Sequence, residues 1–70
     1  MVSLLFCETD DEVVVRKIEG TPEERRHLAE LGITVGGQIT VIAANDGDLV
    51  VSVKGARVAL GREMAGAILV

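Results

Sequence analysis

The stretch from Leu28 to Val41 constrains the fold most, because a helical pattern in it ends on a glycine and a strand pattern begins a few residues later. Leu28 and Leu31 lie three residues apart and therefore share one face of a helix. Gly32 follows at the position where a left-handed residue closes a helix, a conformation that glycine adopts without steric cost. The sequence predicts a short helix folded onto a strand.

The start of this helix is marked by three residues with distinct roles. Thr21 can cap the first turn, and Pro22 suits the first helical position because it lacks the N–H that would be unpaired there. Glu24 stands three residues after the cap, where its carboxylate can bond back to the backbone of Thr21. We therefore expect a helix over Pro22–Leu31.

The rest of the chain is rich in strand-forming residues. Apolar residues make up 49% of the chain and aromatic ones only 1%, so the core must be aliphatic, and β-branched side chains suit a pleated surface. The expected strands cover residues 13–18, 38–43, 49–53, 57–60 and 67–70, the last pairing near the first. Val14 and Ile18 are expected to share a face, and Gly61–Gly66 to form at most one helical turn.

These elements predict one domain over residues 1–70, mainly β with one short helix, in which residues 1–12 form an apolar arm and an acidic turn. Five short strands suit a small barrel closed on itself, because closure removes exposed sheet edges. Seventy residues leave no room for a second domain.

The second and third expected strands form a hairpin around Asn45-Asp46-Gly47-Asp48. Ile39, Val41 and Ala43 on one strand, and Leu49, Val51 and Val53 on the other, are expected to face the core. Facing pairs then have residue numbers that sum to an even value, which requires an odd number of loop residues. The sequence therefore predicts a loop of three or five residues.

Composition excludes several classes of function. No apolar run approaches the roughly 20 residues that span a bilayer, and the first residues lack the basic region of a signal peptide. The lone Cys7 fits a reducing compartment, so we expect a cytoplasmic protein. A net charge of −4 repels phosphate backbones, so we expect no nucleic-acid partner.

No nucleophile has a suitable base nearby in the sequence, so we expect a protein without catalytic activity that requires no cofactor. A site for a divalent transition metal such as iron is geometrically possible, because His27 shares a helical face with Glu23 and is followed by Glu30. Cys7 could join that site if the N-terminal segment folded nearby. A solvated helix face and a buried structural thiol are the interpretations that the sequence favours.

The surface near the helix end is a candidate site for a partner protein. Ile33 and Val35 follow the helix and, with Leu28, can form an apolar patch ringed by Arg25 and Arg26. Arg57 and Arg62 are further basic candidates for contact with an acidic partner. The alternative for Ile33 is that it closes one end of the core.

The order of these elements resembles the FeoA family of small SH3-like domains. The resemblance covers roughly residues 13–70 and depends on the joint spacing of its motifs. The matching residues are Ile18-Glu19-Gly20, Arg26, Leu28, Leu31-Gly32-Ile33, Gly36, Ile39, Val41, Gly55, Ala59-Leu60, Glu63, Ala65 and Ile68.

The resemblance implies an SH3-like barrel that serves as an accessory of bacterial ferrous iron uptake. Its implied partner is the cytoplasmic GTP-hydrolysing region of the membrane permease FeoB, through which the domain would reach the inner membrane without inserting into it. Similar domains form the C-terminal module of metal-dependent repressors, so the resemblance leaves a second function open, that of a metal-sensing regulatory domain.

Overall fold

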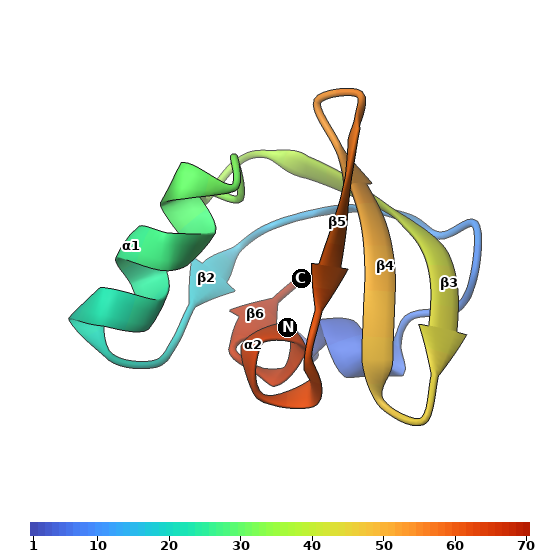
Figure 1. Ribbon diagram of the computed structural model, residues 1–70, viewed down its shortest axis with the longest axis horizontal. Helices are drawn as coiled ribbons and strands as arrows, with labels where there is room; N and C mark the ends of the chain where they lie inside the picture. The colour runs from blue at the N-terminus through green and yellow to red at the C-terminus, as the bar shows by residue number, and fades with distance from the viewer.

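The computed structural model describes residues 1–70 as a mainly β protein. Its elements are η1 (Leu4–Phe6), β1 (Glu12–Val14), β2 (Lys17–Ile18), α1 (Pro22–Glu30), β3 (Gln38–Asn45), β4 (Asp48–Val53), β5 (Ala56–Leu60), α2 (Arg62–Gly66) and β6 (Ile68–Leu69). The strands form two separate antiparallel sheets, one in the order β1-β3-β4-β5 and one of β2 and β6 (Figure 1). The mainly β class is confirmed, whereas the closed barrel of five strands and one helix is not observed.

The predicted strand over residues 13–18 is split between the two sheets. Val15 lies at the division: its N–H donates to the Gly37 carbonyl at 2.9 Å, and it is fully buried. The next residue, Arg16, already bonds to Leu69 beside the second sheet. The chain therefore changes its strand partner at Val15. The expectation that Val14 and Ile18 share a face is wrong, because Val14 is exposed whereas Ile18 packs against the core.

Helix α1 begins as the sequence predicts. The Thr21 hydroxyl accepts from the Glu24 N–H at 3.1 Å, and the Glu24 carboxylate accepts from the Thr21 N–H at 2.9 Å. Each side chain thus satisfies a backbone donor that the first turn leaves free. With Pro22 as its first residue, the helix has a defined starting point.

The predicted corner after α1 is also confirmed. Gly32 has a φ of 90° and donates to the Ala29 carbonyl, while the Ile33 N–H donates to the Leu28 carbonyl at 2.9 Å. These two bonds form a Schellman motif, which commonly joins the residue after the glycine to the last turn in an apolar contact. Leu28 and Ile33 are both buried, so the corner anchors α1 to the core.

The β3–β4 loop differs from the prediction. Asn45 pairs directly with Asp48, so the loop contains only Asp46 and Gly47, whose φ values of 52° and 91° are those of a type I′ turn. The expected loop of three or five residues is therefore wrong.

The expected pairing is also wrong next to the turn, where Ala43 faces Val50, but it holds in the rest of the hairpin because β3 contains a bulge. Ile42 is an extra residue between Val41 and Ala43. On the side of this bulge away from the turn, Val41 faces Val51. The side chains expected in the core are buried, with the exception of Ala43, which is exposed. The bulge restores the register that a two-residue turn alone would have shifted.

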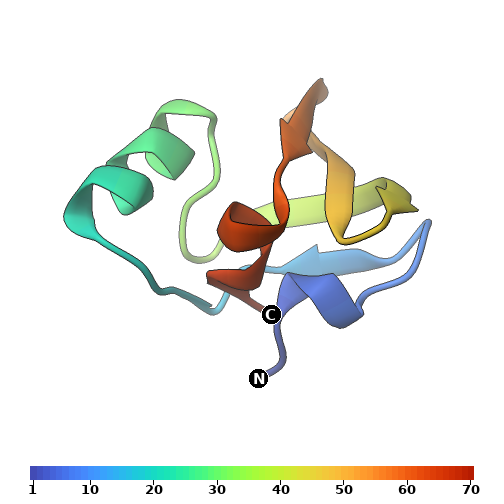
Figure 2. The same ribbon diagram turned by 60° about the horizontal axis from the view of Figure 1, so that its bottom comes forward.

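The core consists of twelve aliphatic residues and contains no buried polar side chain. The end of the chain completes it: Ile68 is fully buried on β6, and β6 pairs with β2 as predicted. Val2 and Val70 exchange two backbone hydrogen bonds of 3.0 and 2.8 Å, so the first and last residues lie side by side (Figure 2). No helix of the structure has both the length and the apolar character to cross a bilayer.

Candidate functional site

The residues of the possible metal site do not form a cluster. Glu23, His27 and Glu30 lie on α1 with exposed side chains, whereas Cys7 follows η1 in another part of the molecule (Figure 1). No group of three or more histidine, cysteine, aspartate or glutamate side chains is placed to hold a metal ion. Metal binding by these residues stays a prediction, and Cys7 lies apart from the other three.

The thiol of Cys7 is held in its protonated form. Burial among apolar neighbours raises its pKa, and the negative charge of Asp11 raises it further. Asp11 is fixed in the same turn, where its carboxylate accepts from the Glu8 N–H at 2.8 Å. Because the thiolate is the form that binds metals and attacks electrophiles, this environment makes Cys7 a poor ligand near neutral pH.

The predicted apolar partner patch is only partly present. Leu28 and Ile33 have exposed fractions of 0% and 1%, so their assignment to a partner surface is wrong: the Schellman corner turns both into the core. The alternative prediction that Ile33 closes one end of the core is therefore confirmed. Val35 remains available, with 63% of its surface exposed.

The four arginines of the predicted partner surface are exposed, and none forms an ion pair. The one ion pair of the molecule joins Lys17 and Glu19 at 3.8 Å. Arg25 donates to the Gly20 carbonyl at 3.4 Å, and the Arg62 guanidinium donates to the Asp46 carbonyl across the β3–β4 turn. Arg26 and Arg57 have no hydrogen bond of this kind, so their charges are free to meet an acidic group.

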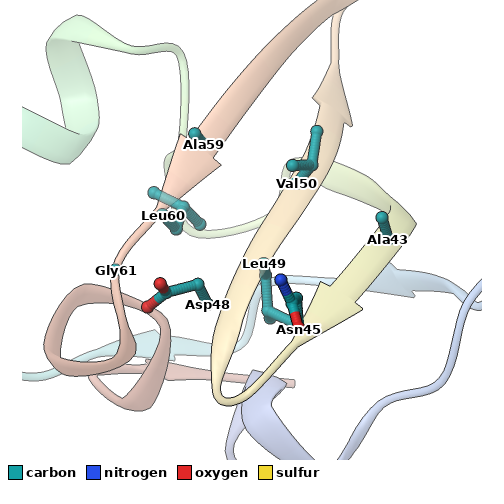
Figure 3. Close-up of a pocket in the computed structure, with 8 residues that line it drawn as sticks. All are labelled: Ala43, Asn45, Asp48, Leu49, Val50, Ala59, Leu60 and Gly61. Carbon is teal, nitrogen blue, oxygen red and sulfur yellow. The ribbon is translucent and has the colours of Figure 1, made fainter.

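A second surface, which the sequence did not predict, covers the side of the four-stranded sheet that faces away from the core; we call it the outer sheet face. Ala43, Val50 and Ala59 form a row across three strands on this face. Because alanines flank the valine on both sides, the row leaves a hollow of about 280 Å³, which we call the apolar depression (Figure 3). Its remaining lining residues are Asn45, Asp48, Leu49, Leu60 and Gly61.

The other half of the outer sheet face is polar. Glu12, Thr40 and Ser52 form a row that continues to Arg57 on β5. The hollow beside them, of about 340 Å³, has no apolar lining residue. The outer sheet face therefore combines an apolar half with a hydrogen-bonding half, an arrangement suited to binding a protein segment.

Only a correct register could have revealed this surface from the sequence. The alternation along β4 places Asp48, Val50 and Ser52 on the face that points away from the core, and the sequence alone predicts this. Joining Val50 to Ala43 required the bulge at Ile42, because without the bulge Ala43 would point to the core.

Three comparisons place the chain among known proteins. A family model described as the FeoA domain matches residues 2–70. An Fe(2+) transport protein A from Methanocaldococcus jannaschii is 34% identical over 70 residues, which span all of this chain and 85% of that protein. These matches cover the whole of both described sheets.

Solved structures agree with the sequence matches. The crystal structure of an iron uptake regulatory protein, FeoA, superposes with a TM-score of 0.89 at 32% identity and covers 96% of this chain and 91% of that one. A manganese-dependent transcriptional repressor in complex with manganese gives a TM-score of 0.90 at 30% identity, over 96% of this chain but only 34% of the repressor. The SH3-like fold implied by the resemblance is thus confirmed, and the chain belongs to the FeoA domain family.

Proposed function

We propose that this protein is a non-enzymatic cytoplasmic accessory of ferrous iron uptake that docks on the GTP-hydrolysing region of a FeoB-type permease and modulates it. The observation that carries the proposal is the match to the FeoA domain over residues 2–70. A relative named for Fe(2+) transport adds to it, because the match spans all of this chain.

The surface of the molecule supports binding to another protein. Arg26 and Arg57 are exposed without a salt-bridge partner, and the outer sheet face has an apolar depression beside hydrogen-bonding side chains. Arg57 lies on β5, two residues from Ala59 of the depression, and an exposed arginine beside an apolar hollow is common in protein interfaces. Docking would bring the domain to the membrane surface through its partner.

The proposal is tested by co-purification of the chain with the cytoplasmic region of the permease, followed by calorimetry with and without guanine nucleotide. We expect a complex, and we expect the GTP hydrolysis rate of the permease region to change when the chain is added. The variant Arg26→Glu tests the α1 surface, with Lys17→Glu as a charge-matched control elsewhere. An absence of binding at high micromolar concentration in both nucleotide states would refute docking.

Similarity to the manganese-dependent repressor supports a second candidate, a regulatory domain that responds to a divalent transition metal. Its test is a titration of the isotope-labelled chain with ferrous, manganous or zinc ion, followed by backbone NMR. Local changes around His27 that disappear in His27→Ala would support a metal site on α1. An unchanged spectrum at millimolar metal would exclude it.

A further inference from the structure

The outer edge of β5 is unpaired. β5 ends the sheet order β1-β3-β4-β5, so β4 is its only neighbouring strand (Figure 1). No backbone hydrogen bond outside the helices and strands involves residues 54–60, and no side chain bonds to their backbone. The N–H and C=O groups along this edge are therefore available to another chain.

The geometry of the β4–β5 hairpin identifies the free groups. Lys54 and Gly55 have φ values of 51° and 82° and form a two-residue type I′ turn closed by the pair Val53 and Ala56. The closing pair of such a turn is hydrogen-bonded, and bonded and non-bonded pairs alternate along an antiparallel ladder. Arg57 and Ala59 therefore turn their N–H and C=O groups away from β4.

The edges at β1 and β2 are better protected than that of β5. β1 has three residues and begins at Glu12 directly after an acidic turn, and β2 has two residues and begins with Lys17. β5 has five residues, contains no proline and pairs with β4 without a bulge. Short strands, charges, prolines and bulges are the usual protections against strand addition, and β5 lacks them apart from one arginine.

The charge around β5 indicates what kind of segment would bind there. Residues 49–62 contain three basic residues, Lys54, Arg57 and Arg62, and no acidic one, in a chain whose net charge is −4. The flanking acidic residues, Asp48 and Glu63, lie at the end of β5 away from Arg57. An acidic segment is attracted to this part of the molecule. A second copy pairing through the same edge would instead bring two basic hairpins together.

The apolar depression supplies a second contact for such a segment. Ala59 lines the depression (Figure 3). Arg57 lies two residues away on the same strand, so both side chains project from the same side of β5. A side chain on a strand paired with β5 would stand about 5 Å from its neighbour on β5. One placed beside Ala59 would lie over the depression, and one two residues away would face the Arg57 guanidinium.

We propose that β5 binds an extended segment of the partner protein by strand addition. The segment carries an acidic side chain beside Arg57 and an apolar side chain beside Ala59, two positions apart on one face. Backbone bonds to Arg57 and Ala59 hold the segment, and the two side chains select it. The identity of the partner rests on the proposed function, whereas the surface and the pattern rest on the geometry of β5.

The test is an NMR titration of the labelled chain with the cytoplasmic region of the permease. We expect the amides of Arg57 and Ala59 to shift and to gain protection from exchange. Ala59→Pro removes one outward N–H while leaving the ladder to β4 intact, and should weaken binding about tenfold. Arg57→Glu should weaken it as well, by an amount that shrinks as salt is added.

Val14→Pro is the matched control, because it removes an outward N–H from the opposite edge of the same sheet: its neighbour Val15 bonds inward to Gly37. It should bind as the unmodified chain does. Spectra of the free variants establish that each is folded, and Arg57→Glu tests the surface without a backbone change.

The outcomes separate the two proposals. Binding with shifts away from β5, or with unchanged affinity in Ala59→Pro and Arg57→Glu, would overturn strand addition and leave docking on the permease intact. No binding by the unmodified chain would overturn the proposed function and with it the assignment of this partner. Sedimentation of the free chain as a dimer that Ala59→Pro dissociates would show that the edge pairs with a second copy, and would also overturn the proposal.

Discussion

Cys7 illustrates how the surroundings of one residue decide its chemistry. It is the only cysteine of the chain, and the sequence allowed it as a metal ligand. Its half-buried position and the nearby Asp11 charge both favour the protonated thiol. Both effects therefore disfavour the thiolate that a metal ligand needs.

The alkylation rate of Cys7 should report this environment. We expect its reaction with iodoacetamide at pH 8 to be slower than that of an unfolded peptide containing the same residues. Asp11→Asn should lower the pKa and speed the reaction, while burial keeps the pKa above its ordinary value. Asp10→Asn removes the same charge from the neighbouring residue and should change the rate less; equal effects would contradict a specific role for Asp11.

At the level of elements, helix α1 depends on its capping box. The Thr21 N–H donates to the Glu24 carboxylate, and this bond, followed by the influence of the Thr21 hydroxyl, lowers the pKa of Glu24. A carboxyl group whose pKa is lower in the folded state contributes stability above its unfolded pKa. That contribution is lost as the pH falls through the folded value.

Thr21→Ala should therefore reduce the free energy of unfolding by about 1 kcal/mol at pH 7. Urea unfolding measures the change, and an NMR pH titration should show the Glu24 pKa rising only part of the way to its ordinary value, because the backbone N–H of residue 21 remains. In Glu24→Gln the stability should fall less on acidification than in the unmodified chain. Glu23→Gln is the control in the same helical turn, and an identical acid response in both variants would exclude the capping box as the cause.

The elements that the sequence predicted correctly are those with local chemical signals. The cap at Thr21 and the corner at Gly32 each depend on a few adjacent residues, so their geometry can be predicted from the local sequence. The bulge at Ile42 has no such signal. A register argument that assumed regular strands therefore rejected a two-residue turn, although Asp46-Gly47 favours one.

The split at Val15 was hidden for a related reason. Residues 13–18 contain no glycine or proline that would mark a break, and composition favours a single strand. The break is imposed by distant partners, since Val15 bonds to Gly37 and Arg16 to Leu69. Pairings between residues so far apart in the chain are the part of the fold that local patterns cannot specify.

At the scale of the whole molecule, the core takes up most of the large aliphatic side chains near the α1 corner: Leu28 and Ile33 are buried, and Val35 is exposed. Leu28 and Ile33 were assigned to a partner surface from their position after a helix, but a 70-residue domain has few apolar side chains with which to build a core. The outer sheet face was missed because it exists only when three strands are in register.

Two substitutions separate core from surface at this corner. Leu28→Ala should reduce the free energy of unfolding by about 2–5 kcal/mol, because Leu28 is fully buried and its loss leaves a cavity. Val35→Ala should change it by no more than about 0.5 kcal/mol, because most of Val35 is exposed. Chemical denaturation of both variants measures the difference, and similar losses would contradict the assigned burial.

The bonds between Val2 and Val70 affect how the protein can be made in the cell. A nascent chain leaves the ribosome from its N-terminal side, so residue 2 emerges well before its neighbour, residue 70, has been translated. The hairpins of β3, β4 and β5 can form earlier, since their contacts are local. The second sheet therefore assembles only after β6 has cleared the exit tunnel, later than these hairpins.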